Sequence, residues 1–129
     1  MTCYKPKFHL LYNSNRCVKT VAFGGDREKD YDQGWNEEWE TYFVVFTDGW
    51  WSCGGDIPIG LSDILRSRGN RADLECVSLG PHGEYYLKAK NGRAWWGGMT
   101  SENLAIISKH KNITFMDFGD DDTFFLRYN

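Results

Sequence analysis

The 129-residue sequence predicts a mainly β (α+β) fold, in which antiparallel strands form quasi-repeated three-strand units of about 40 residues with two short helices between the units. Two observations support this class. One stretch alternates short strand patterns with turn residues, and the same stretch recurs at an offset of 43 residues. Recurrence at a fixed period of this length is the signature of a fold built from stacked units.

The best-defined copy covers residues 74–99 and contains three expected strands, at 74–79, 85–90 and 93–96. The first two strands are separated by Gly-Pro-His-Gly at 80–83, a combination typical of a tight reversal. The second and third are separated by Asn91-Gly92, and both residues tolerate the positive φ of a two-residue hairpin turn.

The other copies extend this pattern over the rest of the chain. Residues 42–55 align with 85–98 without a gap, a third copy beginning at 113 matches the first two strands only, and 8–13 matches 124–129. We therefore predict a single repeat-built domain. It comprises an incomplete unit 1–25, an acidic insertion 26–40, two units at 41–68 and 74–110, and an incomplete unit 112–129.

A short helical pattern follows each complete set of strands. The first helix is expected at 59–66 and ends at Gly69-Asn70, and the second is expected at 101–109 with Thr100 or Ser101 as its N-cap. The apolar spacing of one helix face predicts the residues that face the core. These are Leu61, Ile64 and Leu65 in the first helix, and Leu104, Ile106 and Ile107 in the second.

Alternate residues of a strand point to opposite faces, so aligned copies should agree on which positions are buried. One set, which contains Tyr85, Leu87 and their equivalents up to Tyr128, is largely apolar in every copy and is predicted to form the core. The other set begins with an aromatic residue such as Tyr86 and turns polar. It fits either a second packed layer under the helices or a partly exposed aromatic row.

Charge and hydropathy argue against several classes of protein. The net charge is −3, and the acidic residues concentrate in 26–40 and 120–122 while no basic stripe is present, which argues against a nucleic-acid binder. No stretch reaches the roughly 20 apolar residues of a membrane span. The N-terminal segment lacks the apolar run of a secretory signal, so we expect a soluble, cytoplasmic protein. A mature secreted form would also lack that signal.

The reactive residues form no catalytic or metal-binding motif. The four cysteines are widely spaced and have no histidines at zinc spacing, and free thiols are favoured over two disulfides because the repeat supplies a core without them. No nucleophile elbow, phosphate-binding glycine loop or HExxH motif is present. The acidic run at 120–122 lacks the alternating spacing of a calcium loop. We therefore expect a non-enzymatic protein without a cofactor or a metal.

The aromatic residues point to binding. They make up 16% of the chain, and large rings suit the recognition of flat, partly apolar ligands such as sugar rings. Residues 77–98 carry the pattern V-x-L-G-P-x-G-x-Y followed by N-G-x-x-x-W-x-G. This pattern resembles the multi-copy modules of lectin-like and β-propeller-like repeat proteins. The resemblance implies a carbohydrate-binding module with a glycan partner.

Two adjacent Trp residues in each hairpin imply that one indole is buried and the other is offered to a second layer or to solvent. We predict that outward indoles stack on a sugar face while polar turn residues hold its hydroxyl groups. The predicted ligand-binding residues are Trp51, Trp96, Asp48 and Asn91. The competing hypothesis is a protein-interaction domain in which the acidic segment 26–40, with Trp35 and Trp39, docks a basic protein.

The last strand, at 124–129, ends where a turn and a third strand should follow. It is therefore predicted to be an exposed sheet edge, which tends to pair with another strand. Either the segment 8–12 covers this edge within the same molecule, or a symmetric partner covers it across an interface. The protein is accordingly expected to be a monomer or a homodimer.

Overall fold

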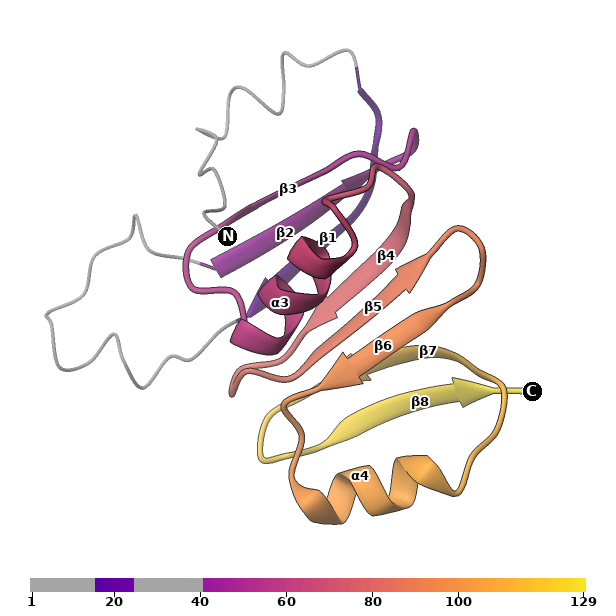
Figure 1. The fold of residues 1–129 in the computed structure, drawn as a ribbon. Coiled ribbons are helices and arrows are strands. Elements are labelled where there is room, and N and C mark those ends of the chain that lie inside the picture. The colour runs from indigo at the N-terminus through magenta and orange to yellow at the C-terminus, as the bar shows by residue number, and fades with distance from the viewer. Residues whose placement is uncertain (1–15, 25–40) are drawn as a thin grey trace, which may run out of the picture.

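The computed structural model describes residues 16–24 and 41–129. Within those residues it contains eight strands and two helices (Figure 1). The predicted strand at 8–12 and the acidic segment 26–40, with Trp35 and Trp39, lie outside the described residues.

The strands form three small antiparallel sheets that follow one another in chain order. The first sheet contains β1 (Val18–Gly24), β2 (Thr41–Phe46) and β3 (Trp51–Gly54); the second contains β4 (Leu74–Leu79), β5 (Tyr85–Ala89) and β6 (Ala94–Gly97); the third contains β7 (Ile113–Phe118) and β8 (Phe124–Tyr128). Helix α3 (Ile59–Ser67) follows the first sheet, and α4 (Ser101–Ser108) follows the second. This confirms the predicted mainly β class with two short helices.

Both faces of the second sheet are buried, each against a different neighbour. The first core joins the first sheet, the second sheet and α3, through Phe43, Val45, Leu61, Leu65, Val77, Leu79, Tyr85 and Leu87. The second core joins the opposite face of the second sheet to the third sheet and α4, through Tyr86, Met99, Ile107 and Met116. Because Tyr85 and Tyr86 are adjacent, they point to opposite faces and enter different cores. The residue set that begins with Tyr86 therefore forms a packed layer in the second sheet.

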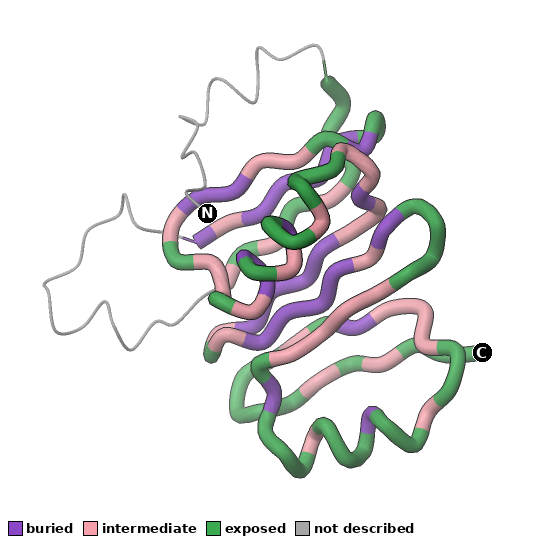
Figure 2. The backbone as a smooth tube through the Cα atoms, in the orientation of Figure 1, coloured by how far each residue is buried: buried purple, intermediate pink, exposed green. Residues whose placement is uncertain are grey.

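The first strands of successive sheets lie close together. β4 runs beside β1 and β2, and β7 runs beside β4 and β5. This close approach requires a small residue in β1, because a Cβ atom on Gly24 would lie 2.7 Å from the carbonyl oxygen of Gly80. Buried residues concentrate in β2, β4 and β5, whereas the third sheet and α4 are largely exposed or half-buried (Figure 2).

Helix α3 lies against the second sheet at its β6 edge, and it buries one face in the first core. Leu61 and Leu65 are 0% and 1% exposed, as the apolar spacing predicts. The helix ends where Gly69 adopts a φ of 72°, and the backbone N–H of Asn70 then donates to the carbonyl oxygen of Leu65 at 3.0 Å. Gly and Asn are suited to this left-handed ending because their steric cost there is low.

Helix α4 begins at Thr100, whose hydroxyl oxygen accepts a hydrogen bond from the backbone N–H of Asn103 at 3.1 Å. Ile107 is buried as predicted, but Leu104 and Ile106 are 39% and 45% exposed, so their predicted core positions were wrong. The third sheet has two strands among the described residues, so it provides no third strand to cover this face of the helix. Tyr128 is likewise exposed, against the core position predicted for it.

The described cysteines differ in oxidation state. Cys17 and Cys76 are free thiols, whereas Cys53 is disulfide-bonded and lies in the first core. The expectation of free thiols was therefore wrong for Cys53, because spacing along the chain does not determine which side chains approach each other. Burial raises the pKa of the Cys76 thiol, which keeps it protonated near neutral pH.

Candidate functional site

Two equivalent hairpin turns and the segment that joins α3 to β4 meet at one end of the molecule. We call this region the turn end; it comprises Arg16, residues 47–50, residues 68–73 and residues 90–93. Backbone hydrogen bonds hold it together: Leu74 N–H donates to the Gly49 oxygen at 3.1 Å, and Lys90 N–H donates to the Asp73 oxygen at 2.8 Å. The Lys90 ammonium group also donates to the Thr47 oxygen at 3.2 Å. The turn end is thus a continuous surface shared by two units.

The two predicted polar turn residues both lie at the turn end and shape their own turns. The Asp48 carboxylate accepts a hydrogen bond from the backbone N–H of Trp50 at 3.0 Å. The Asn91 side-chain oxygen accepts one from the backbone N–H of Arg93 at 2.9 Å. Asn and Asp commonly stabilise turns by bonding the backbone two residues on. Each residue keeps further polar atoms that a ligand could use.

The two indoles predicted to bind a ligand are half-buried and packed against core rings. Trp51 stacks on Phe43 with ring centroids 5.5 Å apart, and its indole N–H donates to the Arg71 carbonyl oxygen at 3.1 Å. Trp96 stacks on Tyr86 with centroids 6.4 Å apart. Both contact the face of their sheet that packs on the next sheet. Trp35 and Trp39 lie outside the described residues.

Trp50 is the exposed indole of the first hairpin, with 47% of its surface accessible. The guanidinium carbon of Arg16 lies 5.4 Å from its ring centroid, and the Arg16 Nε lies 3.2 Å from the Asp48 carboxylate. The guanidinium group therefore lies over one face of an accessible ring, and it pairs with the Asp48 carboxylate. Both charged groups are themselves about half exposed. Sequence reasoning missed this indole because the two adjacent tryptophans are equivalent by pattern alone.

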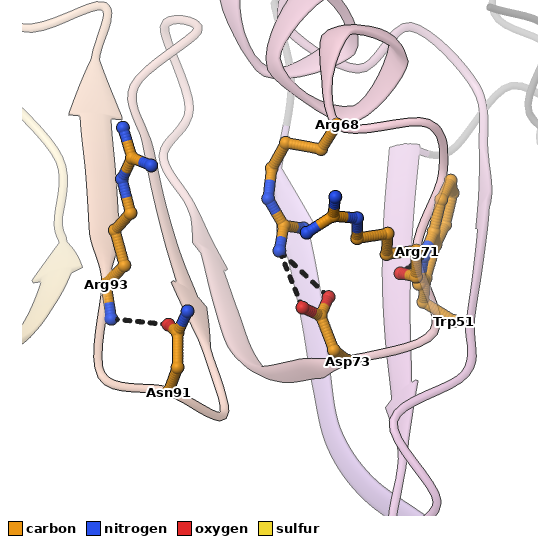
Figure 3. A network of polar contacts seen from close by, with 6 residues as sticks. All are labelled: Trp51, Arg68, Arg71, Asp73, Asn91 and Arg93. Atoms are coloured by element: carbon orange, nitrogen blue, oxygen red, sulfur yellow. Dashed lines mark hydrogen bonds and ion pairs between the residues drawn. The ribbon is translucent and has the colours of Figure 1, made fainter.

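The second part of the turn end is a network of arginines (Figure 3). Nη2 of Arg68 donates to both oxygens of Asp73, at 2.9 and 2.8 Å. The side chain of Arg71 points toward that of Arg68, and Arg93 stands on the neighbouring hairpin. The guanidinium carbons of Arg68 and Arg93 lie 4.8 and 5.0 Å from the ring centroid of Trp95. Trp95 thus serves as a support for two cations.

Sequence reasoning also missed these arginines. A signal was present, since three arginines fall within residues 66–71, directly after the predicted helix. That position has an ordinary structural explanation, because cations near a helix C-terminus are favoured by its dipole. Only the fold brings Arg68, from the preceding unit, to the tryptophan that Arg93 contacts within its own hairpin.

Outside the turn end, the described residues form fewer candidate binding sites. A shallow depression at the β7–β8 turn is lined by Asp117, Phe118, Gly119, Thr123, Phe124 and Phe125. The described residues hold no group of three or more side chains placed to bind a metal ion. None of the helices in the described ranges has the length and apolar character needed to cross a bilayer.

No protein-family model, curated protein or solved structure matches this chain.

Proposed function

We propose that this chain is a non-enzymatic, carbohydrate-binding module whose ligand sits at the turn end, on the exposed ring of Trp50. The supporting observation is the grouping of that ring with the Asp48 carboxylate and the Arg16 guanidinium group. An indole offers a large, rigid apolar surface to the C–H face of a sugar. Charged groups beside it form the stronger class of hydrogen bonds, and sugar hydroxyls can both donate and accept them.

The site is open and shallow in character, because its three side chains are each about half exposed. Such a site makes few contacts with one sugar unit, so we expect weak affinity for a monosaccharide and stronger binding to a polymer that presents many units. The Asp48 carboxylate is held by its own turn and by Arg16, so it does not have to be ordered on binding. Such preorganisation lowers the entropic cost of association.

The test is a glycan array probed with the protein at high valency, followed by titration of any retained glycan. We expect Trp50→Ala to weaken binding at least about tenfold, which corresponds to about 1.4 kcal/mol. Phe125→Ala is the matched control, because Phe125 is an exposed aromatic residue in the third sheet, with no part in the turn end. Retention of no glycan by the wild type, or equal binding by Trp50→Ala, would refute the proposal.

The protein-interaction hypothesis for residues 26–40 stays a prediction. Salt-sensitive capture of a basic protein, together with an empty glycan array, would favour it over carbohydrate binding.

A further inference from the structure

The turn end carries an excess of positive charge on an acidic chain. Its charged side chains are Arg16, Arg68, Arg71, Lys90 and Arg93 against Asp48 and Asp73, whereas the whole chain has a net charge of −3. Among the described residues, the carboxylates of Asp48 and Asp73 each pair with one arginine. The guanidinium groups of Arg71 and Arg93 pair with no described carboxylate. This surface therefore favours a negatively charged ligand.

Arg68 has hydrogen-bonding capacity that its described neighbours do not use. Its side chain is only 12% exposed, and its Nη2 is occupied by Asp73. Its Nη1 is buried and donates to no described residue. A buried charged donor without an acceptor is unfavourable, because it has lost its hydrogen bonds to water and gained none in return. An acceptor placed at this atom would remove that penalty.

The Arg71 side chain is placed so that an acceptor at Nη1 of Arg68 could also bond to the Arg71 guanidinium group. It is exposed, its side chain points toward Arg68, and its backbone is fixed by the hydrogen bond from Trp51. Two guanidinium groups that approach each other repel unless an anion lies between them. Because the Arg71 side chain is exposed, it can rotate to admit a ligand oxygen to Nη1 of Arg68 without disturbing the core.

We propose that Arg68 and Arg71 bind an oxyanion group, with Arg93 adding charge from the other side of the site. Planar guanidinium groups bind sulfate, phosphate and carboxylate oxygens with paired hydrogen bonds. Trp95 and Asp73 hold Arg68 in place, so the site is partly preorganised. A corollary, which rests on the proposed function, is that the saccharide bound at the turn end is an acidic one, carrying sulfate or carboxylate groups.

The first experiment uses inorganic sulfate as the probe, titrated at constant ionic strength against chloride and followed by calorimetry. We expect the wild type to bind sulfate saturably, with a shift of the Arg68 side-chain Nε NMR signal. In Arg71→Ala the dissociation constant should be about tenfold larger. Arg93→Ala should weaken binding less, because Arg93 contributes charge alone. Arg66→Ala is the matched control: it removes the same charge from the exposed last turn of α3 and should change the constant less than twofold.

Two results would overturn the oxyanion site. One is the absence of saturable sulfate binding to the wild type. The other is equal weakening by Arg66→Ala and Arg71→Ala, which would show general charge screening in place of a defined site.

The second experiment separates free oxyanions from those carried by a saccharide. It compares dextran sulfate with uncharged dextran and with polyvinyl sulfate, which carries sulfate on a non-saccharide backbone. We expect dextran sulfate to bind most tightly, Arg71→Ala to weaken both sulfate polymers, and Trp50→Ala to weaken dextran sulfate alone. If Trp50→Ala has no effect on dextran sulfate while Arg71→Ala does, the oxyanion site stands and the saccharide corollary fails. Preference for uncharged dextran would leave carbohydrate binding intact and reject an acidic ligand.

Discussion

The indole ring of Trp51 stacks on the ring of Phe43, with centroids 5.5 Å apart and 20° between the ring planes. This pair joins β3 to β2 on the face that packs against the second sheet. The neighbouring residue, Trp50, is instead the accessible indole. Two adjacent residues therefore differ in role: Trp51 is structural, and Trp50 is the candidate ligand-binding residue.

We expect Trp51→Ala to lower the free energy of unfolding by about 2–4 kcal/mol, because it removes a ring from the first core and leaves a cavity. Trp50→Ala should lower it by less than about 1 kcal/mol, because that ring is half exposed. Urea titration followed by circular dichroism measures both. Equal losses in the two variants would contradict the assignment of structural and surface roles.

The turn glycines Gly49 and Gly92 provide a matched pair. Their φ values are 92° and 91°, so alanine is strained equally at both positions. A Cβ atom on Gly49 would lie 2.4 Å from the Ala72 carbonyl oxygen, whereas one on Gly92 meets nothing within 4 Å. We expect Gly92→Ala to reduce stability by about 1–2 kcal/mol from strain alone, and Gly49→Ala to reduce it by clearly more. Thermal unfolding measures the melting temperature of both variants. Similar melting temperatures would contradict this prediction and would show that the backbone at 71–73 shifts at little cost to make room for the Cβ atom.

Leu61 and Leu104 occupy equivalent places in the two helices, but they are 0% and 39% exposed. We expect Leu61→Ala to destabilise the protein by about 2–5 kcal/mol, because it opens a cavity between two sheets. Leu104→Ala should have an effect of less than about 1 kcal/mol. The midpoint of chemical denaturation reports both changes. A large effect of Leu104→Ala would mean that this face of α4 is covered in solution.

Alkaline pH should weaken the second core through Tyr86. Burial, with a smaller contribution from the charge of Cys76, raises the pKa of the Tyr86 hydroxyl to about 12. The ordinary tyrosine pKa is about 10, so between pH 10 and 12 the unfolded chain loses a proton that the folded chain keeps. Stability is therefore fully present below pH 10 and falls as the pH rises toward 12, by on the order of 2 kcal/mol.

Tyr86→Phe should reduce this decline, because phenylalanine has no proton to lose. At neutral pH the same variant should lose about 1 kcal/mol, since the hydroxyl donates to the Thr114 carbonyl oxygen at 3.2 Å. Denaturation curves at pH 8, 10 and 12 compare the two proteins. Parallel declines in wild type and Tyr86→Phe would assign the pH dependence to other groups.

Much of the local structure was predictable from the sequence. Asn91-Gly92 and Asp48-Gly49 predicted where the two hairpin turns lie. The predicted two-residue turn type was wrong, because of these four residues only Gly49 and Gly92 adopt a positive φ. The i, i+3, i+4 spacing of Leu61, Ile64 and Leu65 predicted α3. Strand alternation identified the two faces of the second sheet, because the direction of a side chain in a strand depends only on its position along the strand.

The tertiary structure decided which of two equivalent residues performs which role. Trp50 and Trp51 are both tryptophan, and only the packing of the second sheet on the first determines which one is covered. Leu104 has the same local pattern as Leu61, but within residues 16–24 and 41–129 the third sheet has only two strands, and Leu104 is exposed. Arg93 lies two residues from Trp95 in the same unit, whereas Arg68 lies in the preceding unit, and only the stacking of the two units brings Arg68 to Trp95. Turn and helix signals act over a few neighbouring residues, whereas burial and the grouping of charges depend on contacts between segments far apart in the chain.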